Sequence, residues 1–283
     1  MANLRTAMDC TDPYWQFCRE ERNFTALLYH ALLSGENLNR FVHNLMGMGI
    51  VPREWVPFNP EDVPVYVEFA IPRDLWARSA TAPSDLDTIN AMRRRAVLEL
   101  LRPGNREDLA HCSVAEWNAH FGAKPVSQEW IQFPGRWTVT GFDKMIRDDE
   151  EFLRTCKFKW AFNIKPDLVI QMTPDQAIVI EAKYESGESA YPSSGPARAL
   201  VEKRAGRLVG QTELQEFLFE DLLGIEAVHL HISRNKDISM SGQKGHALTW
   251  EEALLGVNDF AHIRPWVQEW IERLRDTSDT NRN

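Results

Sequence analysis

Two carboxylates and a lysine flank a short turn in the second half of the chain. Asp167 borders an apolar run before the turn, and Glu181 and Lys183 belong to a second apolar run after it. The turn contains Pro174-Asp175, and this pair between two β-branched runs favours a chain reversal. We therefore expect the two runs to form an antiparallel hairpin centred on Pro174.

Such a hairpin would bring the three side chains together. With the midpoint on the turn proline, Asp167 lies opposite Glu181 or one register step from it. Side chains alternate between the two faces of a strand, so Glu181 and Lys183 share one face while Ala182 points to the other. Asp175 is excluded from the group because it occupies the turn, where it points away from Glu181.

Two like charges that face each other among Ile and Val residues are costly unless another charge offsets them. A hard divalent cation such as Mg²⁺ would do so, because it takes one or two carboxylates, keeps several waters and completes its shell with phosphate oxygens. Lys183 alone would offset one of the two negative charges. The alternative is a solvated hairpin face that carries these residues by chance.

The composition is that of a globular protein. Its 283 residues allow one large domain or two small ones, and 43% hydrophobic residues with ten tryptophans can build a core. No stretch approaches the roughly 20 apolar residues of a membrane span, and residues 1–12 contain no apolar signal segment, so we expect a cytoplasmic protein without membrane contact. The scattered spacing of the cysteines predicts buried free thiols at Cys10, Cys18, Cys112 and Cys156.

The charge balance excludes one way of binding nucleic acid. A net charge of −9 and a pI near 5.4 argue against a protein that coats nucleic acid non-specifically, since that mode neutralises many phosphates. An enzyme with a local basic groove remains compatible, because an acidic metal-holding cluster itself makes the total more negative. Residues 197–210 supply a basic segment, in which a single acid, Glu202, accompanies Arg198, Lys203, Arg204 and Arg207.

Hydrophobic periodicity and end signals predict a mixed α/β chain. Helices are expected over residues 14–46 with a break at Ser34-Gly35, 85–101, 113–121, 141–154, 197–223 and 263–275. Capping-box patterns mark helix starts at Ser113 and Thr249. Strands are expected over residues 65–69, 158–171, 177–184 and 226–232. A basic helix therefore separates the hairpin from the last strand.

This order of elements resembles the PD-(D/E)xK nuclease superfamily. Residues 158–232 carry the resemblance, with Pro166-Asp167 at the first strand and Glu181-Ala182-Lys183 on the second, followed by the basic helix and a strand. The motif is complete, and its specificity comes from the ordering of elements rather than from the letters. The resemblance implies an α/β fold of the restriction-endonuclease-like type, a mixed sheet core flanked by helices, with a largely helical insertion and C-terminal helices.

The resemblance also implies an activity and a partner. Members of the superfamily hydrolyse phosphodiester bonds with Mg²⁺ or Mn²⁺, so nucleic acid is the expected substrate, with DNA favoured over RNA, in prokaryotic defence, restriction or repair. A homodimer is compatible with this interpretation. A nuclease-like module that binds nucleic acid or a protein without cleavage is the competing hypothesis, and an enzyme acting on a small phosphate compound is a third.

Roles follow for the matched residues. The resemblance assigns Asp167 and Glu181 to the metal, and Lys183 to the attacking water and to the negative charge that develops on the phosphate. Glu21, on the helix before the sheet, joins the metal shell, with Glu20 as the alternative one position away. A solvated surface glutamate is the other interpretation of Glu21.

The basic helix would form the wall that faces the substrate. Lys203, Arg207 and Gln211 recur on it at four-residue steps, and the resemblance places Gln211 among the catalytic residues. Arg198, Lys203, Arg204 and Arg207 are expected to contact the substrate. The alternative is an ordinary charged amphipathic surface.

The chain length between the first helices and the hairpin predicts an insertion. Roughly 110 residues are too many for a loop, so they are expected to form a subdomain. The expected domains are N-terminal helices of the nuclease core at 1–46, an inserted, mostly helical subdomain at 47–155, the nuclease core at 156–245, and a C-terminal helix with a polar tail at 246–283.

Two further patterns receive ordinary structural interpretations. The run Arg93-Arg94-Arg95 is expected in the core or on a solvated face rather than on nucleic acid. His229 and His231 share a strand face, and without a third ligand in view they are expected to be ordinary sheet-surface histidines.

Overall fold

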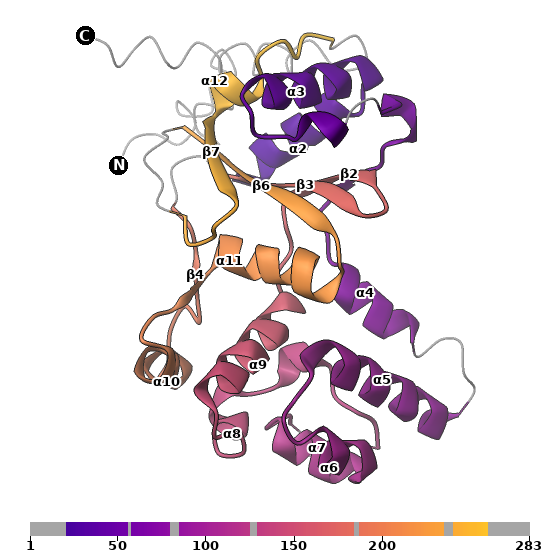
Figure 1. The fold of residues 1–283 in the computed structure, drawn as a ribbon, viewed down its shortest axis with the longest axis vertical. Coiled ribbons are helices and arrows are strands. Elements are labelled where there is room, and N and C mark those ends of the chain that lie inside the picture. The colour runs from indigo at the N-terminus through magenta and orange to yellow at the C-terminus, as the bar shows by residue number, and fades with distance from the viewer. Residues whose placement is uncertain are drawn as a thin grey trace, which may run out of the picture.

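The computed structural model describes residues 21–55, 58–79, 85–124, 129–183, 187–234 and 240–259. A five-stranded sheet in the order β1-β2-β3-β6-β7 forms its centre (Figure 1). The first three strands pair antiparallel, and β6 and β7 add to β3 in parallel. The strands are β1 Val65–Val67, β2 Leu168–Thr173, β3 Gln176–Ala182, β6 Glu226–Ser233 and β7 Gly245–Thr249. The predicted mixed α/β class is confirmed.

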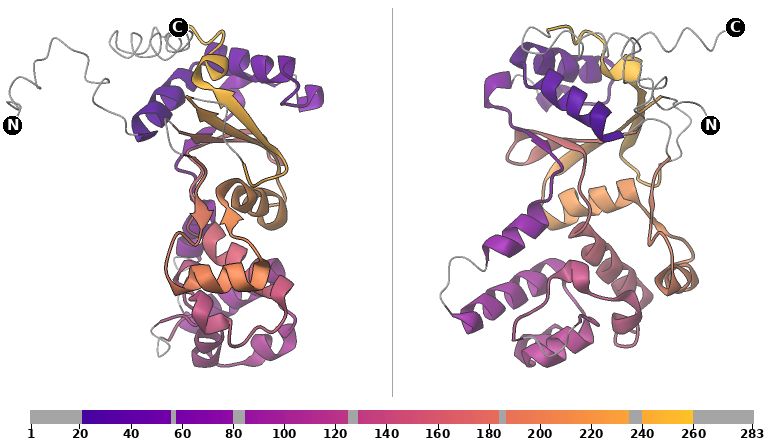
Figure 2. Two further views of the ribbon diagram at one scale, coloured as in Figure 1. Left: turned by 90° about the vertical axis from the view of Figure 1, so that its left-hand side faces the viewer. Right: turned by 180° about the vertical axis from the view of Figure 1, so that it is seen from behind.

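Helices α2 (Glu21–Leu32), α3 (Gly35–Gly47) and α12 (Trp250–Ala253) cover one face of this sheet (Figure 1, Figure 2). The even-numbered residues of the hairpin point to them, and Ile170 and Ile180 are buried in one cluster with Phe24 and Phe41. Alternation along the strands therefore assigns the odd-numbered residues, Glu181 among them, to the opposite face.

The opposite face is covered by α11 (Gln211–Glu216), which continues as the π-helix η5 (Phe217–Leu222) (Figure 1). Odd-numbered Val169 and Val179 pack there in a second core cluster. The helix α9 (Asp149–Ala161) contacts α11 from the side away from the sheet. The sheet is thus the middle layer of three.

The remaining helices extend this second core away from the sheet (Figure 2). One buried cluster joins Trp117, Phe142 and Phe152 of the helical part to Val169 and Val179 of the sheet. The elements are α4 Ile71–Arg78, α5 Leu86–Leu101, α6 Arg106–His111, α7 Val114–His120, α8 Val139–Phe142 and α10 Pro196–Ala205, the two-stranded sheet of β4 Ala190–Tyr191 and β5 Val209–Gly210, and the 3-10 helix η4 Pro134–Arg136. The 3-10 helices η2 Arg53–Trp55 and η3 Pro60–Asp62 belong to the other face, where Trp55 is buried in the cluster of Phe24 and η3 contacts α3.

The predicted inserted subdomain is only partly a separate element of the fold. Its strand β1 (Val65–Val67) pairs with β2 and so forms an edge of the central sheet. The helices from α4 to α9 follow, and their core is continuous with the sheet. The helical part therefore begins near residue 71 rather than at residue 47.

The strand predicted over residues 158–171 is wrong in its first half. The helix α9 runs through Phe158 to Ala161, and β2 begins only at Leu168. The N-cap Asp148 accepts a hydrogen bond from the Glu151 N–H, and three acidic residues occupy the first turn, where the helix dipole favours them. These end signals lie far from residue 158, so the local apolar run alone suggested a strand.

The single helix predicted over residues 197–223 is also wrong. α10 ends at Ala205, and Gly206 follows with a φ of 71°, a left-handed conformation that glycine adopts without strain. The strand β5 then intervenes before α11 starts at Gln211. The proposed polar face of Lys203, Arg207 and Gln211 therefore does not exist as one helical face.

Several end signals are confirmed. Ser113 and Thr249 form the predicted capping boxes, and Asp85 caps α5. The break at Ser34 separates α2 from α3 as expected. The helix predicted over residues 263–275 lies outside the described residues, as do Cys10 and Cys18. Cys156 is a buried free thiol as predicted, whereas the free thiol Cys112 is only half-buried.

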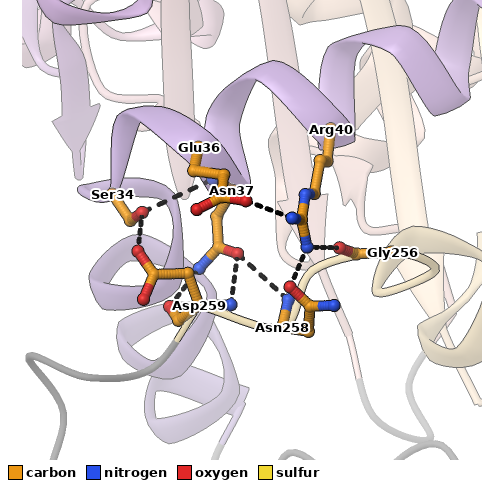
Figure 3. Close-up of polar contacts among 7 residues, drawn as sticks. All are labelled: Ser34, Glu36, Asn37, Arg40, Gly256, Asn258 and Asp259. Atoms are coloured by element: carbon orange, nitrogen blue, oxygen red, sulfur yellow. Dashed lines mark hydrogen bonds and ion pairs between the residues drawn. The ribbon is translucent and has the colours of Figure 1, made fainter.

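A polar cluster joins α3 to the chain after α12 (Figure 3). The buried Asn37 side chain donates to the carbonyls of Ala31 and Asp259, at 2.9 and 2.5 Å, and its Oδ1 accepts from the Asn258 and Asp259 N–H groups. Ser34 Oγ donates to Asp259 Oδ2 at 2.5 Å. These bonds fasten residues 258–259 to the start of α3.

In the described part of the chain, none of the helices is long and apolar enough to cross a bilayer.

Candidate active site

The predicted hairpin and its register are confirmed. β2 and β3 pair antiparallel with Leu168 opposite Ile180, so the next step along the strands brings Asp167 opposite Glu181. Asp167 is fixed there because its Oδ2 accepts a hydrogen bond of 2.8 Å from the Ala182 N–H. Both carboxylates therefore lie where two adjacent strands meet the same edge of the sheet.

Glu181 is buried, with 5% of its surface exposed, and both of its oxygens have partners. Its Oε1 lies 2.7 Å from Lys183 Nζ, and its Oε2 accepts a hydrogen bond of 2.9 Å from Gln215 Nε2. A buried carboxylate needs such partners, since burial removes its hydration. The structure thus brings together all three residues of the hairpin motif.

The backbone of Lys183 is held from two sides. Its N–H donates to the Ile232 carbonyl of β6 at 2.7 Å, and its carbonyl accepts from Trp250 Nε1 of α12 at 2.9 Å. Only 12% of its side chain is exposed. The parallel strand β6 and the helix α12 therefore hold the backbone of Lys183 in place. Its side chain extends from there to Glu181.

Gln215 is the residue that sequence reasoning missed. It lies on α11, is 2% exposed, and reaches across to the sheet to hold Glu181. The predicted Gln211 begins the same helix, where its N–H donates to the Ser189 carbonyl at 2.9 Å. Among the described contacts, the Gln211 side chain makes no hydrogen bond. The two glutamines lie one helical turn apart, so the sequence pointed to the helix face that contacts Glu181. The catalytic role of Gln211 stays a prediction.

The loop before β4 positions α11. Glu188 Oε1 accepts from the Thr212 N–H at 2.5 Å, in the first turn of the helix, where a carboxylate is favoured. The same side chain accepts from the Ser241 N–H at 2.7 Å and from the Ser241 hydroxyl at 2.9 Å. The Glu188 carboxylate thus links its own loop, the first turn of α11 and Ser241. Because it caps α11, it also helps to position Gln215 on that helix.

Tyr191 on β4 lies within electrostatic reach of the cluster. Burial raises the pKa of its phenol, the Glu181 carboxylate raises it further, and the Lys183 ammonium opposes both. The ring centroid is 6.0 Å from that of Trp160. Its hydroxyl therefore stays protonated at neutral pH and remains a hydrogen-bond donor near Glu181.

The two strand histidines are buried, each with 2% exposure, and the prediction of sheet-surface histidines is wrong. His231 is the register partner of Glu181 on β6, so both side chains share the face under α11. Burial lowers the pKa of His229 to about 3, with smaller contributions from Lys244 and His246. His229 is therefore neutral at physiological pH. The alternating pattern of β6 suggested exposure because the covering helix is distant in the sequence.

Glu21 begins α2, and its side chain lies outside the described residues. The start of this helix is nevertheless near the hairpin. A hydrogen bond from Lys165 is the main cause that lowers the pKa of Glu68, and the charge of Arg22 adds to it. The Glu68 N–H in turn donates to the Asp167 carbonyl at 2.9 Å. Glu21 as a metal ligand stays a prediction.

The predicted substrate-binding residues have different surroundings. Arg204 is 12% exposed, bonds to Asp143 and Asp149, and donates to three backbone carbonyls, so it fastens α10 to the chain around α8 and α9. The Arg204 guanidinium is therefore engaged within the protein, and its contact with a substrate stays a prediction. Arg207 forms a two-pronged ion pair with Glu213, a residue that sequence reasoning did not single out.

Two of the basic residues remain accessible on α10. Arg198 lies 3.2 Å from Glu202 in an exposed pair, and such pairs contribute little stability. Lys203 is exposed and makes no ion pair with any described residue. α10 packs beside α8 and α9 (Figure 1), so these two cations lie on the helical side of the sheet.

The donor set of the cluster consists of oxygen atoms. Within the described ranges, no group of three His, Cys, Asp or Glu side chains stands in a metal-holding arrangement. Two carboxylates with a backbone carbonyl suit Mg²⁺ or Mn²⁺, which retain several waters, better than Zn²⁺, which prefers nitrogen and sulfur ligands. The residues present therefore fit a hard divalent cation.

Comparisons with known proteins give no relative. The chain matches no protein-family model, no curated protein and no solved structure.

Proposed function

We propose that the chain is a metal-dependent nuclease of restriction-endonuclease-like fold that hydrolyses phosphodiester bonds, with DNA favoured over RNA. One observation carries the proposal. Asp167 and Glu181 face each other at the same edge of adjacent strands, and the ammonium of Lys183 lies 2.7 Å from Glu181. This is the complete PD-(D/E)xK set of side chains on a hairpin of the expected register.

Asp167 and Glu181 would hold the Mg²⁺ or Mn²⁺ ion, with the Ala182 carbonyl and Glu21 as further oxygen donors. When bound, such an ion supplies Lewis acidity and positive charge against the scissile phosphate. Asp167 is preorganised for this role by its bond to the Ala182 N–H. The hydrogen bond from Gln215 keeps Glu181 in one orientation, which favours a precise site over a mobile one.

Lys183 would stabilise the negative charge that develops on the phosphate and orient the attacking water. Its ammonium lies 2.7 Å from Glu181 Oε1, so a phosphate held by an ion on the two carboxylates would come close to this positive charge. The Tyr191 hydroxyl offers a further donor at the rim. Arg198 and Lys203 on α10 supply cations for the nucleic-acid backbone, as the resemblance implies.

The competing proposal is a nuclease-like module that binds without cleaving. A specific observation favours it: both oxygens of Glu181 are satisfied by Lys183 and Gln215 within the protein itself. The Lys183 ammonium and the Gln215 amide thus stabilise the buried charge of Glu181 without a metal ion. Nuclease action remains the better account because a merely structural cluster places no requirement on a second carboxylate, Asp167, at the opposite strand.

Incubation of the full chain with labelled single-stranded DNA, double-stranded DNA and RNA, in Mg²⁺, Mn²⁺ or EDTA, separates these proposals. Cleavage that requires the metal and disappears in EDTA is the expected result. Binding to any of the three without cleavage in either metal would refute the nuclease and favour the module. Cleavage that persists unchanged in EDTA would refute the role of the cation.

A further inference from the structure

A cavity lies away from the hairpin motif, between α4, α5 and the end of the π-helix η5. Its volume is about 210 Å³, and its walls are almost entirely apolar. Leu75 and Met92 are half exposed, while the wall contains Trp76, Leu100, Phe162 and Leu222. None of Asp167, Glu181 and Lys183 lines it, so it is not part of the proposed active site.

One cation, Arg93, lies in the wall of this cavity. The residue is 9% exposed, and its guanidinium carbon lies 4.7 Å from the centroid of the Trp76 ring. Nε donates to Ser79 Oγ at 3.1 Å, and one Nη donates to the Trp76 carbonyl at 3.4 Å. Two of the five guanidinium N–H donors are therefore used, and three remain.

Arg93 forms no ion pair with any residue of the described ranges, and no charged group contributes to the shift of its pKa. Burial lowers the pKa of the guanidinium, although it stays charged at neutral pH. A buried cation without a carboxylate is costly, because its lost hydration is not replaced by an opposite charge. Its surroundings therefore favour an anion from outside the chain.

We propose that this cavity binds a small apolar monocarboxylate. The carboxylate pairs with the free edge of the Arg93 guanidinium, in the two-pronged geometry that arginine prefers. The hydrocarbon part lies against Leu100, Phe162 and Leu222. A single cation in an apolar wall suits one negative charge and excludes a phosphate dianion, whose second charge would lack a partner.

The size of the cavity sets the size of the ligand. An engineered apolar cavity of about 150 Å³ in another protein holds benzene. The 210 Å³ of this cavity therefore accommodate a somewhat larger body, such as an alkyl chain of medium length. Octanoate is the probe that we choose, with octan-1-ol as its neutral and octylammonium as its cationic counterpart.

Isothermal titration calorimetry on the full chain tests the proposal. Octanoate should bind at least about tenfold more tightly than octan-1-ol, which is the effect of one hydrogen-bonded ion pair, and octylammonium should not bind. Arg93→Gln should remove the preference for octanoate. The matched control is Arg95→Gln on the same helix, because Arg95 is 80% exposed and pairs with Glu99. This variant should bind as the wild type does.

Equal binding of octanoate and octan-1-ol, or unchanged binding by Arg93→Gln, would overturn the proposal. If Arg93→Gln does not fold, Arg93→Lys keeps the charge and loses the two-pronged pair, and its octanoate affinity should fall several-fold. Light scattering tests whether a second copy of the chain occupies the cavity instead. A dimer that Met92→Glu dissociates, together with no octanoate binding, would assign the cavity to a second copy of the chain and refute the ligand.

Discussion

Gln215 carries the most specific claim about the site, because its single side-chain bond joins α11 to Glu181 across the layer boundary. Gln215→Leu keeps the volume of the side chain and removes the donor. The lost bond is 2.9 Å long, is directed at a carboxylate, and is buried on both sides, since Gln215 is 2% and Glu181 5% exposed. Hydrogen bonds to charged groups contribute about 1.5–3 kcal/mol, so the free energy of unfolding should fall by about that amount.

Equilibrium unfolding in urea, followed by tryptophan fluorescence, measures this loss. Gln211→Leu is the matched control, since Gln211 lies one turn earlier on α11, is 7% exposed, and makes no side-chain hydrogen bond with the described residues. The control should lose less than about 1 kcal/mol. A double-mutant cycle with Glu181→Gln should give a coupling energy of about 1 kcal/mol or more between the two positions.

Equal losses for Gln215→Leu and Gln211→Leu, or a coupling energy near zero, would show that the bond between Gln215 and Glu181 does not hold the site together. The orientation of Glu181 would then depend on Lys183 alone.

Three further predictions concern the frame around the site. His229→Leu should flatten the pH dependence of stability. In the native protein the imidazole, with its pKa lowered to about 3, stays neutral, whereas in the unfolded chain it takes up a proton near pH 6.5. Between pH 7 and pH 5 the free energy of unfolding, measured in urea, should therefore fall by about 2 kcal/mol more in the wild type than in the variant. Asn37→Ala should lower the free energy of unfolding by about 2–4 kcal/mol, because it leaves two backbone N–H groups without acceptors. Asn39→Ala, at an exposed position of the same helix, should cost below about 1 kcal/mol. Arg204→Met should cost about 2–3 kcal/mol by thermal unfolding, since two carboxylates and three carbonyls lose their donor, and Arg198→Met should change stability by less than about 0.5 kcal/mol. An unchanged slope with pH, or losses equal to those of the paired controls, would contradict these assignments.

The hairpin was predictable because its signals are local. A turn marked by Pro174-Asp175 between two β-branched runs fixes the register, and alternation then decides the face of Glu181 and Lys183. The helix caps at Ser113 and Thr249 were predictable for the same reason. Each of these signals lies within a few residues of the feature that it specifies.

The errors share a different origin. The helix over residues 197–223 breaks at Gly206, where a left-handed residue and a short strand replace one turn, and a single glycine in a polar sequence is a weak signal. The strand β7, which the sequence did not suggest, gains its place by parallel pairing with β6. Gln215 and the burial of His229 depend on α11 packing against the sheet, a contact between distant segments that no local pattern encodes.

The most direct test of the central claim is the rate of Mg²⁺-dependent cleavage of labelled DNA by the wild type and by three near-isosteric variants. Asp167→Asn, Glu181→Gln and Lys183→Met should each lower the rate at least about 100-fold, the usual effect of removing one group that stabilises charge in the transition state. Circular dichroism should show that each variant keeps its fold. Wild-type rates in all three folded variants would contradict the account.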